Sequence, residues 1–186
     1  MNAPIRLQSL DAAVALLLER IPGPVHLAAP LGIGKPHRLL NAIYRRIAGD
    51  PSMSLNIHTA LSLTPPKGGV ELEGRFLGPF AARHFGDDFE ALDYALALKR
   101  DALPANIHVE EFYMQSGALL GSRQAQRSYA SLNYTHVARD MAARGPTLLL
   151  QMVARRGDRL SLSCNPDVTL ELLERMAANG QARPYV

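Results

Sequence analysis

The sequence contains one cysteine and no tryptophan among its 186 residues. A single cysteine excludes an internal disulfide, which fits a reducing compartment. The N-terminus lacks the basic-then-apolar pattern of a secretory signal, and the longest apolar runs are too short to cross a bilayer. We therefore expect a soluble, cytoplasmic protein without a membrane partner, in which Cys164 is a buried structural thiol.

Strong charge of one sign is also lacking. Twenty Lys and Arg residues against 17 Asp and Glu residues leave a formal net charge of only +3. The basic pairs Arg45-Arg46, Lys99-Arg100 and Arg155-Arg156 are far apart in the chain, whereas nucleic-acid-binding proteins usually concentrate such charge. We therefore expect no nucleic-acid partner. A mild positive field is compatible with a phosphate-bearing small ligand.

The composition, 47% hydrophobic and 20% charged, is that of a globular domain large enough to bury a core. No internal repeat or linker divides the chain, so we expect a single domain over residues 1–186. Apolar spacing in the first 63 residues alternates helix (9–21), strand (25–29), helix (36–48) and strand (54–63). This order predicts an α/β fold with a mostly parallel sheet flanked by helices.

In the 36–48 helix, the spacing places Arg38, Asn41, Arg45 and Arg46 toward water. The later elements are expected in this order: a loop over 64–75, a helix over 87–100, a strand over 106–114, a short helix over 123–129, a helix capped by Thr135, a buried strand over 147–153, a half-buried antiparallel strand over 160–164 and a last helix capped by Asp167.

A glycine-bearing turn follows the first predicted strand. Gly32 and Gly34 allow close backbone approach, and Pro36 is suited to open the next helix. Such a turn either builds an anion site or only connects strand and helix. Both common nucleotide motifs fail, because Ala29 and Pro36 break the triphosphate loop and His37 breaks the dinucleotide fingerprint. The ligand is therefore expected to be neither a nucleoside triphosphate nor a dinucleotide.

Other polar groups are weaker candidates. The six histidines and the cysteine show no metal-ligand spacing, so no metal site is expected. Glu110 and Glu111 could supply a nucleophilic carboxylate at a strand end, but they point to opposite faces, so at most one of them faces a given site. A solvated or salt-bridged pair is the ordinary interpretation. The stretch 131–140 gathers many donors before a helix, which indicates either polar-ligand binding, which we favour, or a buried network.

Four stretches, taken together, resemble the acetyl-CoA hydrolase/transferase family, class I CoA-transferases related to 4-hydroxybutyrate and butyryl-CoA:acetate CoA-transferases. They lie at residues 30–46, 76–80, 131–140 and 160–167, and the similarity extends from about residue 25 to the end. The resemblance implies a NagB/RpiA/CoA-transferase-like fold built of two similar halves, of which this chain resembles the first. The family's nucleophilic glutamate lies in the second half, so no catalytic residue is expected here.

The implied substrates are an acyl-CoA, with coenzyme A as the moving group, and a small carboxylate or water as acceptor. The implied partners are the C-terminal half of the same polypeptide and, in addition, a second copy in a homodimer. The expected substrate-binding residues are Gly32, Ile33, Gly34, Ser116, Gly117, Asn133, Tyr134 and His136. Backbone amides of the glycines and of the Ser116-Gly117 turn are candidate oxyanion donors. The alternative is a non-catalytic α/β module that binds CoA or another phosphate-bearing ligand at the glycine turn.

Overall fold

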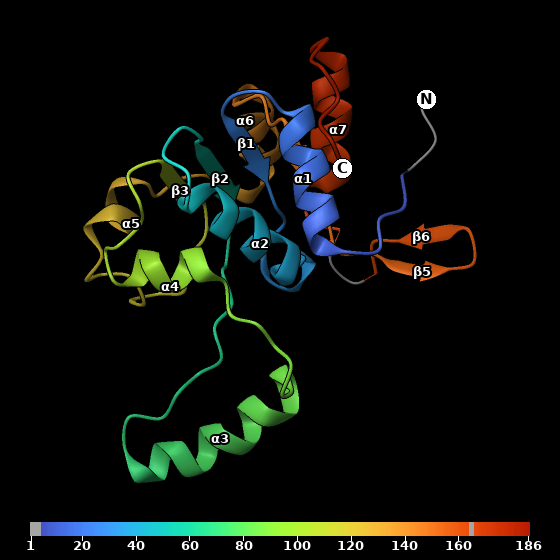
Figure 1. Cartoon of the computed structure of the whole chain (residues 1–186). Helices are drawn as coiled ribbons and strands as arrows, with labels where there is room; N and C mark the ends of the chain where they lie inside the picture. The colour runs from blue at the N-terminus through green and yellow to red at the C-terminus, as the bar shows by residue number, and fades with distance from the viewer. Residues whose placement is uncertain (1–4, 164–165) are drawn as a thin grey trace.

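The fold is built on a four-stranded parallel sheet with the strand order β3-β2-β1-β4. The computed structural model describes residues 5–163 and 166–186 (Figure 1). The strands of the sheet are β1 (Val25–Ala28), β2 (Leu55–Thr59), β3 (Ile107–Glu111) and β4 (Leu148–Leu149). Helices lie on both faces, which confirms the α/β prediction.

The remaining elements are a set of helices and one hairpin. They are α1 (Leu10–Arg20), η1 (Gly32–Gly34), α2 (His37–Ala48), α3 (Glu71–Phe85), α4 (Asp93–Lys99), α5 (Arg123–Arg127), η2 (Tyr134–His136), α6 (Val137–Ala143), the antiparallel strands β5 (Ala154–Arg156) and β6 (Arg159–Ser161), and α7 (Thr169–Ala178).

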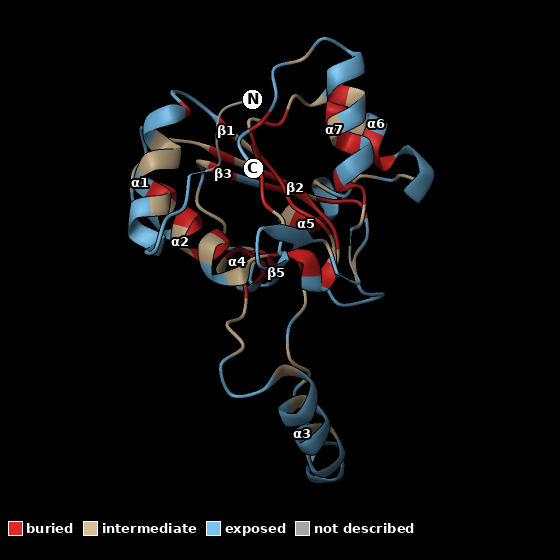
Figure 2. Ribbon diagram, turned by 90° about the vertical axis from the view of Figure 1, so that its right-hand side faces the viewer, coloured by how far each residue is buried: buried red, intermediate tan, exposed pale blue. Residues whose placement is uncertain are grey.

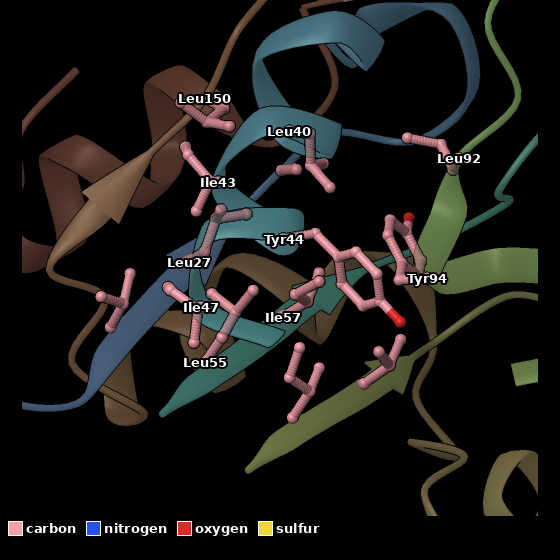
Figure 3. Packing of buried hydrophobic residues seen from close by; sticks show 14 of the residues in the cluster. Leu27, Leu40, Ile43, Tyr44, Ile47, Leu55, Ile57, Leu92, Tyr94 and Leu150 are labelled. Atoms are coloured by element: carbon pink, nitrogen blue, oxygen red, sulfur yellow. The ribbon is translucent and has the colours of Figure 1, made fainter. Parts of the chain in front are cut away.

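Alternating side chains of the strands divide the core into two layers. One layer packs Leu27 and Ile57 of the sheet against Leu40 and Ile43 of α2 (Figure 3). The opposite layer packs residues such as Leu149 against α6 and α7. The strand residues are buried nearly throughout (Figure 2), as expected for a parallel sheet covered on both faces.

Local features define the ends of two helices. The Ser9 side chain accepts a hydrogen bond from the Ala12 amide at 3.1 Å and caps α1. Gly145 follows α6 with a φ of +60°, a left-handed conformation that suits glycine after a helix. Within residues 5–163 and 166–186, the helices lack the length and apolarity of a membrane span.

The prediction for residues 64–100 is partly wrong. Helix α3 occupies Glu71–Phe85, where the sequence indicated a loop followed by an irregular segment, and α4 covers only Asp93–Lys99 of the predicted 87–100 helix. The sequence did not predict α3, because it contains Gly74, Gly78 and Pro79, and these residue types disfavour the interior of a helix. Burial did not offset this, since every residue of α3 remains at least partly exposed.

Asn41 is fully buried and does not face water as predicted. Its side-chain amide donates to the Ala91 carbonyl at 2.8 Å, and its oxygen accepts from the Asp93 amide at 2.9 Å. The segment before α4 therefore runs along this side of α2. Helical spacing within α2 could not reveal a segment that lies about 50 residues later in the sequence.

Four predictions for the C-terminal part of the chain also need correction. Thr135 lies inside η2, so it does not cap α6, and Val168 occupies the position before α7 that was assigned to Asp167. The predicted 147–153 strand is confined to β4. The β5–β6 hairpin is exposed along its length instead of half-buried. Cys164 lies outside the described residues.

Candidate functional site

The glycine turn lies where the direction of the sheet reverses. Successive strands β1, β2 and β3 extend to one side, whereas β4 pairs with the other side of β1. The chain after β4 stays close to this turn, because the Met152 amide donates to the Gly34 carbonyl at 2.8 Å. In open α/β sheets, ligands bind outside the carboxyl ends of the strands at such a switch point. The predicted turn thus occupies the position that this fold class uses for ligands.

The turn is held by its own hydrogen bonds. Gly32 has a φ of +55°, where an L side chain would be strained. Its amide donates to the Leu61 carbonyl at 3.1 Å, and the Gly34 amide donates to the Leu31 carbonyl at 3.2 Å. Both amides are therefore engaged, and either could bind an oxyanion only after its hydrogen bond opened. Ile33, between them, is 60% exposed.

A buried cation supports the turn from below. Lys35 is only 1% exposed, and its ammonium donates to the carbonyls of Ala60 and Leu61, the latter at 3.2 Å. Burial lowers the pKa of Lys35 to about 8, while the charges of Glu111 and Asp167 act in the opposite direction. Spacing along the sequence does not distinguish Lys35 from an exposed lysine. Only the tertiary structure, in which its ammonium reaches the carbonyls that follow β2, reveals that it is buried.

A second polar group lies at the carboxyl end of β3. The Ser62 hydroxyl donates to the Glu111 carboxyl and lies 2.7 Å from the Tyr94 hydroxyl. Burial raises the pKa of Glu111, although the Ser62 hydrogen bond and the Lys35 charge oppose this effect. Burial likewise raises the pKa of Tyr94. A small cavity of about 80 Å³ adjoins Ser62 and Glu111.

The two glutamates have separate environments, as their alternation predicted. Glu110 accepts from the Arg144 guanidinium at 2.6 Å on the α6 side of the sheet, so the salt-bridge interpretation holds for this residue. Glu111 belongs instead to the buried network with Ser62 and Tyr94. A single carboxylate therefore faces the carboxyl-edge site from β3.

Asp167 joins the donor-rich stretch 131–140 to the glycine turn. Its carboxylate accepts from the Leu31 amide at 2.8 Å and from the Tyr134 hydroxyl. Partial burial and then the hydrogen bond to Asp167 raise the pKa of Tyr134. The sequence indicated the importance of both segments, but the contact between residues 31 and 167 required the tertiary structure.

The other predicted binding residues are less closely associated with the turn. Asn133 and His136 are exposed, and the His136 amide donates to the Asn133 carbonyl at 2.8 Å. Ser116 and Gly117 are exposed in the loop that borders the small cavity near Glu111. The structure therefore links Tyr134 to the start of the glycine turn through Asp167 and leaves Ser116, Gly117, Asn133 and His136 without such a link.

An open groove of about 440 Å³ begins beside the exposed Ile33 side chain. The groove belongs to the α2 side of the turn, and its polar lining comes from Lys35, His37, Arg38, Asp88 and Glu90. Its apolar lining comes from Leu10, Ile33, Pro36, Leu39, Phe85, Phe89 and Met152. A largely apolar groove with a few polar groups is typical of small-molecule sites.

Replacement of Tyr134 by Phe tests whether the link through Asp167 is real. We expect Tyr134→Phe to lower the free energy of unfolding by about 1 kcal/mol, because one hydrogen bond to a carboxylate is lost. Tyr113→Phe is the matched control, since both phenols are 53% exposed. Urea unfolding measures both variants. Equal losses in the two variants would contradict the proposed link.

Comparison of the chain with models of known protein families, with curated proteins and with solved structures finds no match. Among the described residues, no three His, Asp or Glu side chains form a group that could hold a metal ion. The functional assignment therefore depends on the geometry of this edge of the sheet and on the sequence resemblance described above.

Proposed function

We propose that this chain is the acyl-CoA-binding domain of an acetyl-CoA hydrolase or CoA-transferase with a NagB/RpiA/CoA-transferase-like fold. The observation that carries the proposal is the glycine turn at the switch point of the parallel sheet, with an apolar groove opening at Ile33. The four stretches that resemble the acetyl-CoA hydrolase/transferase family supply the substrate class. Together they favour an acyl-CoA thioester bound across the glycine turn.

The groove suits the thioester end of the substrate better than its nucleotide end. A volume of about 440 Å³ lies within the usual range for small-molecule sites. The apolar lining fits an acyl chain and the adjoining arm of coenzyme A. Arg38 lines the groove, and its contact with Asp88 at 3.6 Å is a weak surface pair. Its guanidinium is thus available to a phosphate oxygen.

In the proposed reaction this domain binds and positions the substrate. A glutamate of the second half attacks the thioester carbonyl and forms an anhydride. The released CoA thiolate then attacks the glutamyl carbonyl of the anhydride, which gives a glutamyl-CoA thioester and releases the acyl group as its carboxylate. An acceptor carboxylate then takes CoA by the same two steps in reverse, or water hydrolyses the thioester to free glutamate and CoA. Binding of the remote parts of CoA can lower the barrier at the thioester. Glu111 is poorly suited as the nucleophile, because it is buried, bound to Ser62 and has a raised pKa.

The alternative, a non-catalytic module that cradles a phosphate on the glycine turn, has weaker support. A phosphate cradle needs free backbone amides. The amides of Gly32 and Gly34 already donate to protein carbonyls. The apolar character of the groove also favours an acyl ligand over a bare phosphate.

Substitution of Ile33 tests the proposal directly. We expect Ile33→Glu to weaken acetyl-CoA and butyryl-CoA binding by tenfold or more in calorimetric titrations, because it places a carboxylate at the apolar groove. Leu170→Glu is the control, since Leu170 is comparably exposed on α7. The wild-type chain is expected to bind without hydrolysing the thioester. Absence of acyl-CoA binding by the wild type, or unchanged binding by Ile33→Glu, would overturn the proposal.

A further inference from the structure

Helix α3 extends away from the body of the molecule (Figure 1). Every one of its residues remains at least partly exposed (Figure 2). Phe76 is 75% exposed. Residues 61–70 and 86–92 connect it to the body without regular secondary structure. Both connections begin near the carboxyl edge of the sheet, so α3 is presented to solvent at some distance from the core.

The composition of α3 does not suit an isolated helix. Gly74, Gly78 and Pro79 lie in its interior, and all three disfavour a helical conformation. Helices of about 15 residues are marginal in water even with favourable sequences. A helix of this composition therefore needs a second surface to stabilise it.

One side of α3 carries the pattern of a helix-pairing seam. Phe76 and Phe80 are four residues apart, with Glu73 three residues before them and Arg83 three residues after them. Spacings of three, four and three residues place all four side chains on one face of a helix. The face thus has an acidic residue at its start, two aromatic residues in the middle and a basic residue at its end.

This order is complementary to itself when two helices run in opposite directions. An antiparallel pair centred on Gly78 brings Glu73 opposite Arg83 of the second copy and Phe76 opposite Phe80 of the second copy. Both contacts then occur twice, as a two-fold symmetric interface requires. We propose that α3 pairs with the α3 of a second copy of this chain in an antiparallel, two-fold symmetric contact.

Charge reversal at the two ends of the seam tests the proposal. Sedimentation velocity of the wild-type chain at low salt is expected to show a reversible dimer. Glu73→Arg and Arg83→Glu are each expected to weaken dimerisation tenfold or more, because each places like charges opposite one another twice. An equimolar mixture of the two variants is expected to form a heterodimer. In the mixed pair, the two introduced side chains have opposite charges and face each other at one end, while the native Glu73 and Arg83 face each other at the other end.

Glu71→Arg is the matched control, because residue 71 lies outside this face and its reversal should leave the dimer intact. Circular dichroism checks that each variant keeps the wild-type fold. A wild-type chain that stays monomeric overturns the proposal. A monomer is expected if α3 instead packs against the groove beside Ile33 of the same chain. Dimerisation of either single variant, or failure of the mixture to associate, overturns it equally. None of these outcomes depends on acyl-CoA binding.

Discussion

Acidification from pH 6.5 to pH 4 is expected to lower the free energy of unfolding by about 3 kcal/mol through His58 alone, as the pKa difference implies. His58 lies on β2 and is only 8% exposed. Its Nδ1 has no hydrogen-bond partner among the described residues. Glu110 Oε2 stands 3.5 Å away without hydrogen-bond geometry, and that carboxylate is already bound by Arg144.

Burial is the main cause of this sensitivity. Burial, as the largest cause, and the positive charges of Arg144, His26 and His108 together lower the pKa of His58 from 6.5 to about 4, although Asp140 opposes them. Between pH 6.5 and about pH 4, His58 is protonated in the unfolded chain but not in the folded chain. Stability from this group is therefore complete above pH 6.5 and is lost as the pH falls toward 4.

His58→Gln isolates the effect, because glutamine cannot titrate. The stability difference between wild type and His58→Gln should shrink by about 3 kcal/mol from pH 6.5 to pH 4, measured by urea unfolding at each pH. His136→Gln is the control, since His136 is exposed and its charge is not among those that shift the pKa of His58. If the pH profile of His58→Gln is parallel to that of the wild type, His58 is already charged in the folded protein and the prediction is wrong.

Raising the pH from 8 to 10.5 is expected to increase the free energy of unfolding by about 3 kcal/mol through Lys35. The buried ammonium is costly to keep charged, so its pKa in the folded chain is about 8 against 10.5 for an ordinary lysine. Between these values the unfolded chain holds the proton that the folded chain has released. The fold is therefore relatively stabilised as the pH rises through this window.

Lys35→Met tests this prediction while keeping an apolar side chain of similar length. Wild type should gain stability relative to Lys35→Met as the pH rises from about 7.5 to about 10, a range that limits tyrosine ionisation in the unfolded chain. Lys67→Met, in an exposed loop, is expected to follow the wild-type profile. A constant difference between wild type and Lys35→Met across this range would mean that Lys35 is not desolvated.

The pKa values of His58 and Lys35 also determine which charges are present near the site. Near pH 7, His58 is neutral and Lys35 is largely protonated. The carboxyl edge therefore keeps one buried positive charge under the glycine turn, faced by Glu111 and Asp167.

Local patterns in the sequence determined much of the fold. Alternation of helical and strand spacing was sufficient to predict the parallel sheet and the turn at Gly32 and Gly34, because these features depend on residues that are neighbours along the chain. The same reasoning placed Glu110 and Glu111 on opposite faces of β3. It did not find α3, since Gly74, Gly78 and Pro79 weaken the local signal and no residue of that helix is buried.

The tertiary structure alone decided which polar groups meet. Asp167 reaches the Leu31 amide across 136 residues of sequence, and Ser62 meets Glu111 across 49. The burial of Lys35 and Asn41 likewise depends on segments that are distant along the chain. Spacing within one helix or strand carries no information about such neighbours. Hence the sequence placed the glycine turn, whereas only the packed fold showed the buried cation and the carboxylate that hold it.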